Sequence, residues 1–368
     1  MNSRELYEQM IGMVPIKSED TNYDFRIQVK KSLRHYLDLL AKFDVAERPN
    51  NWGDIRFRVE LLCDGINRAI ESEYLGLRHS AYTSIKNQLD GYSTHKHDVD
   101  GLISDGDNLS RVEKGMVFYR MRVVPIEDRK KQKRKDIFHL PFDKKGEVKT
   151  QRFSVPGYPC LYLSHRLYGC WEEMGRPDFG TVMVSKYQAV DGFSVFDLRV
   201  PSQEKWEKNI EQCIKLFPLV IASMVQVQKE SDPYKPEYLI PQLLTEWVIS
   251  HNKDLRGEEK SKEVLGILYT SAQKNDDFDF PFDSYDNYAI PVLKPLSSKK
   301  YCERLKGLFM LTLPTYYDFE VLKNGQRMNE GDYGIESEQD QREDNMNCSQ
   351  FGEMEKYLDD KKLDSLSD

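Results

Sequence analysis

The sequence has 368 residues, of which 39% are hydrophobic and 31% are charged, so it is long enough for two domains with buried cores. Its longest apolar run, residues 216–225, is interrupted by Pro218 and Ser223 and is far shorter than the roughly 20 residues of a membrane span. The first ten residues are polar and acidic, unlike a signal peptide. We therefore expect a cytoplasmic protein with no membrane partner.

The net charge of −8 is concentrated near the C-terminus. Residues 329–368 contain thirteen acidic and four basic residues, a balance of −9, which leaves a balance of +1 for the rest of the chain. This acidic tail is rich in Gln, Asn and Asp and poor in β-branched residues, which predicts disorder. The remainder carries no bulk charge that would attract nucleic acid or a membrane surface, and we expect no nucleic-acid partner.

The six cysteines are scattered along the chain without a C-x-x-C pair. This pattern argues against a zinc ribbon and against a disulfide framework, and it indicates reduced, mostly buried thiols. The seven histidines form no H-E-x-x-H pair, so we expect no metal site.

Residues 1–95 predict a helical domain. Apolar residues recur every three or four positions at 25–40 and at 55–66, which is the spacing of amphipathic helices. Breaks at 49–51 and 91–93 separate the helices. Such domains more often supply protein contacts than chemistry, and we expect that this one could join copies of the chain into a homo-oligomer.

A polar linker is expected at residues 96–111. Residues 116–124 then predict a strand in which arginines alternate with apolar residues. The basic run 128–135 is interpreted as a solvated loop, because such runs are usually exposed and bind nucleic acid only in a minority of cases. His139, in the sequence FHLPF, is interpreted as a histidine packed in the core or in a turn.

The stretch TQRFSVPGYPCLYLSHRLYGCWEEM, residues 150–174, is the one around which the chain is organised. It predicts a turn at Pro156-Gly157, a buried strand at 160–163, and a helix with Ser164 as its N-cap. The helix has an apolar face and ends in two adjacent carboxylates, and its key residues are Leu167, Cys170, Trp171, Glu172, Glu173 and Met174. A turn, a strand bearing a tyrosine and a helix that delivers a carboxylate are typical of a ligand pocket.

The later elements alternate between strands and helices. Strands are expected at 180–184, 193–198, 266–271, 288–292 and 308–313, and helices at 203–228 and from 238 onward. Pro218 is expected to kink the first helix, whereas Pro241 fits only in the first turn of the second.

Six segments resemble the RES domain, a family named for an arginine, a glutamate and a serine. In chain order they are FYRMR, DIFHLPF, TQRFSVPGYPCLYLS, CWEEM, EYLIPQLL and GILYTS. The resemblance covers residues 112–315, and we place the domain at 112–320. Residues 1–95 also resemble the HEPN-like helical domains that are sometimes fused ahead of RES domains. The resemblance implies an α+β protein: a helical domain followed by an ADP-ribosyltransferase-like α/β domain with a split, mainly antiparallel sheet.

RES proteins are toxins that degrade NAD+ by phosphorolysis or hydrolysis and release nicotinamide. The resemblance therefore implies an NAD+ phosphorylase or glycohydrolase, with inorganic phosphate as co-substrate in the first case and no further cofactor. It also implies an antitoxin or regulatory protein as a partner. The residues that match the family motifs are Arg120, Glu173 and Ser271 as catalytic residues, and Arg120, Tyr162, Arg152 and Tyr119 as substrate-binding residues.

These residue types suit the implied chemistry. Nicotinamide leaves as a neutral molecule and needs no general acid, so one carboxylate, Glu173, is enough to stabilise the charge that develops on the ribose. Arg120 or Arg152 would give the pyrophosphate a permanently charged fork, and Tyr162 would give a flat ring an aromatic wall. Ser271 would hydrogen-bond a phosphate or ribose oxygen or orient the carboxylate, because the motifs supply no histidine to activate it as a nucleophile.

Two points about the site residues stay open. Helical periodicity does not separate Glu172 from Glu173, although the spacing from Tyr162 favours Glu173. Phe153 and Ser154 follow Arg152 where RES toxins commonly have tryptophan and asparagine, which leaves the phosphate contacts undetermined.

Other functions are also open. The same pocket could transfer ADP-ribose to a macromolecule, or it could sense a nucleotide without turnover. The R-x4-6-H pattern of HEPN ribonucleases is absent from residues 1–95, which argues against a ribonuclease.

Overall fold

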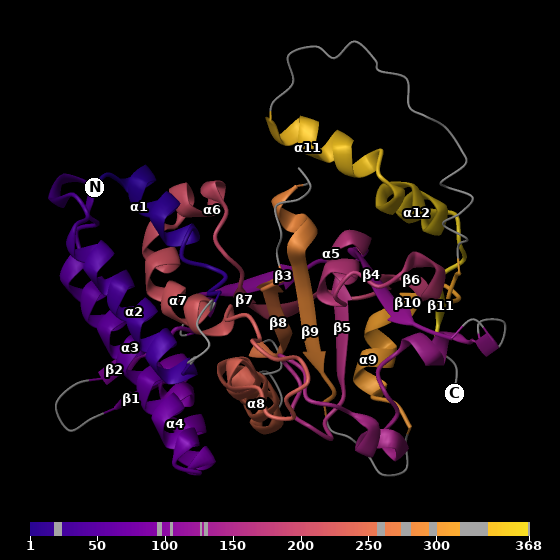
Figure 1. The fold of residues 1–368 in the computed structure, drawn as a ribbon, viewed down its shortest axis with the longest axis horizontal. Helices are drawn as coiled ribbons and strands as arrows, with labels where there is room; N and C mark the ends of the chain where they lie inside the picture. The colour runs from indigo at the N-terminus through magenta and orange to yellow at the C-terminus, as the bar shows by residue number, and fades with distance from the viewer. Residues whose placement is uncertain are drawn as a thin grey trace. The chain divides into compact units, whose positions relative to one another are not determined.

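A computed structural model describes ten ranges of the chain: 1–17, 24–93, 98–103, 106–125, 127–128, 132–255, 262–273, 281–293, 300–316 and 338–366. The chain divides into two compact units (Figure 1). Unit 1 comprises residues 1–110, 149–157 and 194–272, and unit 2 comprises 111–148, 158–193 and 273–368. Each unit is described by itself.

Unit 1 begins with the helices that the sequence predicts. These are α1 (Ser3–Ile11), α2 (Phe25–Ala41), α3 (Trp52–Tyr74) and α4 (Arg78–Asp90). Apolar residues at helical spacing form their buried faces, and the Asp24 carboxylate caps α2 by accepting from the amides of Arg26 and Ile27. Helix α4 ends at Asp90 and is followed by Gly91, whose φ of 80° favours glycine. The short strands β1 (Gly91–Ser93) and β2 (Asp98–Asp100) pair there as a hairpin.

Residues 194–272 pack with these helices in the same unit. They form α6 (Gln203–Lys208), α7 (Ile210–Ser223), α8 (Leu239–Asp254) and the parallel strands β7 (Phe193–Leu198) and β8 (Val264–Thr270). The hydroxyl of Tyr36 in α2 donates to the carbonyl of Ile214 in α7 at 2.8 Å. The domain boundaries expected from the sequence stay predictions. Within this unit, α7 and α8 pack against α2, α3 and α4.

Unit 2 is built on antiparallel strands in the order β11-β10-β6-β4-β5-β9 (Figure 1). Their bounds are β4 (Val117–Val123), β5 (Cys160–Ser164), β6 (Val182–Ala189), β9 (Asp286–Pro291), β10 (Phe309–Leu311) and β11 (Asp364–Ser365). Every neighbouring pair in this run is antiparallel, whereas β7 and β8 of unit 1 are parallel. The prediction of an α+β protein with helices first and a mainly antiparallel sheet is confirmed.

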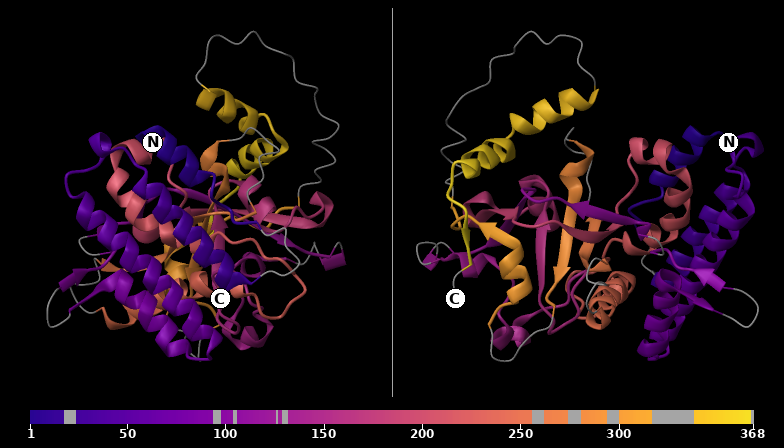
Figure 2. Two further views of the ribbon diagram at one scale, coloured as in Figure 1. Left: turned by 60° about the vertical axis from the view of Figure 1, so that its left-hand side comes forward. Right: turned by 180° about the vertical axis from the view of Figure 1, so that it is seen from behind.

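The described residues of unit 2 include the α-helices α5 (Leu167–Glu173), α9 (Glu303–Leu308), α11 (Glu338–Asn347) and α12 (Gln350–Asp359). Helix α5 packs on β4, and α12 packs beside α5 and β6 (Figure 2). Their apolar side chains share one buried cluster with Tyr119 and Met121 of β4. This cluster is the core on one face of the unit 2 sheet.

The structure corrects several local predictions. Ser164 is the last residue of β5 rather than a helix N-cap, because its hydroxyl donates to the carbonyl of Asp286, and α5 begins at Leu167 without a side-chain cap. The helix expected at 203–228 is interrupted at Asn209, whereas α7 continues through Pro218. Part of the expected linker forms β2, and the segment 308–313 begins as the end of α9 before it becomes β10.

The acidic tail also differs from the expected disorder. Residues 338–366 form α11, α12 and β11, because one side of α12 is apolar enough to be buried. Residues 329–337 and 367–368 lie outside the described residues, as do 129–131 of the basic run. Within that run, Arg134 donates to the carbonyl of Leu311 at 2.9 Å instead of standing free in solvent.

The structure also bears on the expected lack of membrane spans and on the state of the cysteines. No helix in the described part of the chain is both long and apolar enough to cross a membrane. All six cysteines are free thiols; five are buried and Cys348 is exposed, as the scattered spacing predicts.

Candidate functional site

The unit 2 sheet splits between β4 and β5. Strand β4 pairs with β6 along its whole length and β5 does so with β9, but β4 and β5 share only the pair Tyr119 and Ser164. Among the described residues no further register pair joins the two strands, so the ladder between them is interrupted. Arg120 lies at this opening and donates from its guanidinium to the carbonyl of Tyr162 at 2.6 Å.

The guanidinium of Arg120 is poorly compensated. The side chain is half-buried, its Nε is buried without a hydrogen-bond partner, and it forms no ion pair with a carboxylate among the described residues. Burial lowers the pKa of Arg120, with Tyr187 acting in the opposite direction. Because buried charges are normally paired, an uncompensated guanidinium with a free donor marks a place where an anion would be stabilised.

Two tyrosines lie on the opposite face of these strands. Side chains alternate along a strand, and residues directly opposite each other share a face, so the pair Tyr119 and Ser164 places Tyr119 and Tyr162 on one side and Arg120 on the other. Tyr119 is 6% exposed and Tyr162 is half-buried. The long arginine side chain reaches the split from the far face and bonds the backbone of the strand that carries Tyr162.

Helix α5 lies over the tyrosine face at very short range. The thiol of Cys170 donates to the carbonyl of Tyr119 at 3.3 Å, and a Cβ added to Gly169 would lie 2.7 Å from the carbonyl oxygen of Ser284. Only glycine allows the helix to approach this closely. Burial raises the pKa of Cys170 to about 12 against the effect of Arg120, so this thiol stays protonated and is a packing group rather than a nucleophile.

The two adjacent acids at the end of α5 have different environments. Glu172 is 2% exposed, and its carboxylate accepts from the Tyr168 hydroxyl at 2.5 Å and from Arg176 Nε and Nη2 at 3.0 and 2.7 Å. Arg176 itself has a φ of 60°, a left-handed conformation that costs energy in a non-glycine residue. Glu172 is therefore committed to holding the helix end, whereas Glu173 is half-buried.

This network is the main feature of the site that the sequence did not reveal. Tyr168 and Glu172 are spaced four residues apart on one side of α5, and Arg176, four residues further on and beyond the helix end, reaches back to the same carboxylate. That spacing was the signal available, and it was masked by the glycine and proline that surround Arg176. The network holds the C-terminal end of α5 in one conformation, and it therefore fixes the backbone position of the adjacent Glu173.

The other two predicted site residues belong to unit 1. Arg152 is 7% exposed and donates to the carbonyls of Ser223 and Val225 at 2.9 and 3.0 Å, and its guanidinium lies over the ring of Tyr238. Ser271 is fully buried directly after β8. The substrate-binding role of Arg152 and the catalytic role of Ser271 stay predictions.

His139 is packed, as its sequence context predicts. Its Nε2 accepts from the amide of Cys302 at 2.9 Å, while Nδ1 lies 2.8 Å from the carbonyl of Leu140 and donates to it. Burial lowers the pKa of His139 to about 4, so the ring is neutral. In the part of the chain that the structure describes, no three His, Cys, Asp or Glu side chains gather as they would around a metal ion.

The comparisons with known proteins identify one similar toxin. A curated protein of Bacillus subtilis (strain 168) named "Putative toxin YopC" is 31% identical over 277 residues, which make up 71% of this chain and 59% of the relative. The chain thus spans less than two thirds of that protein's length. No protein-family model matches the sequence, and no solved structure does. The chain is therefore similar to a protein named as a toxin.

Proposed function

We propose that this chain is a toxin enzyme of the RES type that cleaves the bond between nicotinamide and ribose in NAD+. The observation that carries the proposal is Arg120: a half-buried side chain whose buried Nε has no hydrogen-bond partner, at the split between β4 and β5. A dinucleotide supplies the anion that such a group lacks. The similarity to a protein named as a toxin supports the coarser part of the proposal.

Each group in unit 2 has a chemical task in this proposal. Arg120 binds the pyrophosphate, and we assign this task to it rather than to Arg152, whose guanidinium already serves two carbonyls. Tyr119 and Tyr162 provide aromatic surface for a flat ring. Glu173 stabilises the positive charge that develops on the ribose as the leaving group departs.

The bond changes are simple. The bond from ribose C1′ to the nicotinamide nitrogen breaks, and its electron pair neutralises the pyridinium, so the leaving group needs no proton. An oxygen of water or of inorganic phosphate forms the new bond to C1′. Water gives ADP-ribose and releases one proton, whereas phosphate gives the 1′-phosphorylated product. Measuring products with and without phosphate separates the two reactions.

The test is nicotinamide release from NAD+ by the purified full chain. Glu173→Gln removes the charge at nearly constant volume and should lower the rate by about 10²–10³-fold, the typical effect of removing one group that stabilises transition-state charge. Glu204→Gln is the matched control, because Glu204 is an exposed carboxylate in unit 1 that pairs only with Lys208 at the surface. Arg120→Lys should raise KM more than it lowers kcat, since it keeps the charge and loses the fork.

The proposal fails if the wild-type chain releases no nicotinamide, or if Glu173→Gln matches the Glu204→Gln control. Transfer of label from NAD+ to a protein or nucleic acid would instead favour ADP-ribosyl transfer. Tight binding of NAD+ without product over hours would favour a nucleotide sensor.

A further inference from the structure

Residues 338–366, named here the C-terminal arm, dock on the same face of unit 2 that carries Tyr119. Within the arm, α12 buries Phe351, Met354, Glu355 and Leu358, which recur at the three- and four-residue spacing of one helix face. The three apolar side chains, Phe351, Met354 and Leu358, join the cluster formed by α5, β4 and β6. The arm therefore binds as an amphipathic helix in a groove.

Phe351 is the apolar anchor of the arm. Its ring centroid lies 5.3 Å from that of Tyr168, 5.5 Å from that of Trp171 and 5.4 Å from that of Phe179, so three aromatic rings surround it. Phe351 is 5% exposed in this pocket. Aromatic groupings of this kind add to the energy of simple burial.

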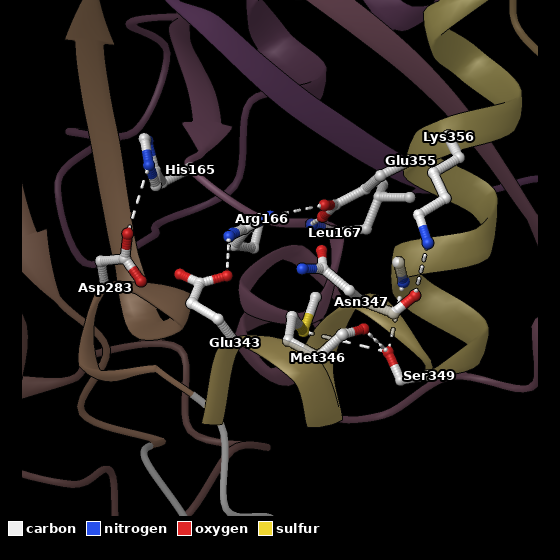
Figure 3. A network of polar contacts seen from close by, with 11 residues as sticks. His165, Arg166, Leu167, Asp283, Glu343, Met346, Asn347, Ser349, Glu355 and Lys356 are labelled. Atoms are coloured by element: carbon white, nitrogen blue, oxygen red, sulfur yellow. Dashed lines mark hydrogen bonds and ion pairs between the residues drawn. The ribbon is translucent and has the colours of Figure 1, made fainter. Parts of the chain in front are cut away.

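Carboxylates of the arm bind the start of α5 (Figure 3). The two oxygens of Glu355 accept from the amide of Leu167 at 2.7 Å and from Arg166 at 3.1 Å. A second nitrogen of Arg166 donates to Glu343 at 2.7 Å. Because the side chains of Arg166 and Glu355 are only 20% and 7% exposed, these contacts lie in a partly desolvated site where they are strong.

Two further contacts hold the end of the arm. Lys186, which is almost fully buried, donates to the Asp359 carboxylate at 3.1 Å. Strand β11 then extends the sheet, with Ser365 opposite Met310 of β10. The arm is thus attached by a helix, by ion pairs and by strand addition, all of which are reversible modes of peptide binding.

The docked arm covers a residue that the proposed enzyme needs. Tyr119 is 6% exposed, and its pKa is raised by burial and then by the nearby carboxylates of Glu355 and Asp359. The arm therefore covers the tyrosine face of β4, on which the flat ring of the proposed substrate would pack.

We propose that the apolar face formed by Tyr168, Trp171 and Phe179 is a docking surface whose ligand is the C-terminal arm, and that the docked arm is an intramolecular inhibitor. Its release uncovers Tyr119 and the face of β4 that carries it. This inference rests on the proposed function for the identity of the substrate, but not for the existence of the inhibition.

Two designs test the inhibition in the full chain. Phe351→Asp places a charge in the aromatic pocket and should release the arm, and Tyr357→Asp makes the same kind of change on the exposed side of α12, where Tyr357 is 36% exposed. The second design introduces Met310→Cys and Ser365→Cys together with Cys348→Ser. The two new cysteines can form a reducible disulfide lock that holds β11 of the arm on β10. Register partners in antiparallel strands are close enough for a disulfide, and the five other cysteines are buried.

Two readouts are compared: NAD+ cleavage by the purified chain and growth arrest when the chain is expressed. Amide hydrogen exchange of residues 338–366 reports release of the arm independently of any chemistry. Phe351→Asp should speed exchange of the arm and raise both activities at least tenfold, whereas Tyr357→Asp should match wild type. The oxidised lock should suppress both activities, and reduction should restore them to the wild-type level.

The inference is overturned if the released arm leaves both activities unchanged or lowers them in a chain that remains folded. If Phe351→Asp does not fold, the lock alone decides, and equal activity of its oxidised and reduced forms overturns the inference. Stronger growth arrest on release, with no NAD+ cleavage by any variant, supports the inhibition and rejects NAD+ as the substrate.

Discussion

The neighbouring carboxylates Glu172 and Glu173 allow a direct test, because the same substitution should affect a different property at each position. Glu172→Gln removes the negative charge that accepts hydrogen bonds from the Tyr168 hydroxyl and from two nitrogens of Arg176. Charge-assisted hydrogen bonds are worth about 1.5–3 kcal/mol and neutral ones about 1 kcal/mol. A glutamine keeps the volume and one acceptor, and Arg176, which is 30% exposed, can turn toward water. We therefore expect a loss of about 2 kcal/mol.

That loss corresponds to a fall in Tm of about 4–8 °C, at about 2–4 °C per kcal/mol for a domain of 150–250 residues. Glu173→Gln should lower stability by less than about 1 kcal/mol, since Glu173 is only half-buried. Calorimetry gives the stabilities, and nicotinamide release at a temperature well below both transitions gives the activities. Glu172→Gln should keep activity within a few-fold of wild type, whereas Glu173→Gln should lose it.

The reverse result would refute this reasoning. A Glu172→Gln variant with wild-type Tm and no activity would make Glu172 the reacting carboxylate, and its bonds to Tyr168 and Arg176 would then be a device for orienting it. A Glu173→Gln variant that melts several degrees lower would show that Glu173 is structural.

Three further predictions concern stability and activity. The pKa of His139 is about 4 in the folded protein, below its usual value of 6.5, so the neutral ring contributes fully to the free energy of unfolding above pH 6.5. About 3 kcal/mol of that free energy is lost as the pH falls to 4. His139→Gln should flatten this part of a profile of stability against pH. Gly169→Ala should destabilise the protein by about 1–3 kcal/mol and lower activity, because its Cβ would press on the carbonyl of Ser284 and shift α5. Arg152→Lys should lower Tm even without substrate, since it loses bonds to two buried carbonyls; an unchanged Tm would argue that Arg152 serves the ligand instead.

The sequence was most informative where a single periodicity ran for several turns. The spacing of Phe25, Val29, Leu33 and Leu40 predicts α2, because only one helix face can bury all four. The strand at 160–163 was predicted as well, since a short apolar run bounded by a turn fits a buried strand. In these segments local pattern and tertiary burial agree.

Local rules failed where a long-range partner decided the outcome. Ser164 has the chemistry of an N-cap, but its hydroxyl is taken by the carbonyl of Asp286, far away in the sequence. Glu172 and Glu173 are equivalent to any periodicity, and only the left-handed conformation of Arg176 and the position of Tyr168 separate them. The committed guanidinium of Arg152 likewise depends on the ends of α7, which no local pattern reveals.

The average composition of the acidic tail conceals an amphipathic helix that binds unit 2. Composition over residues 329–368 is that of a disordered segment, yet ten of those residues form α12 with one apolar face. Part of the negative charge that predicted disorder is complementary to cations elsewhere in the chain. The largely buried side chains of Arg166 and Lys186 form ion pairs with Glu343, Glu355 and Asp359 of the tail. Buried cations need such partners, because desolvation outweighs any other gain when one is left alone. The body of the chain, with its balance of +1, therefore carries cations that pair with three of the tail's acidic residues.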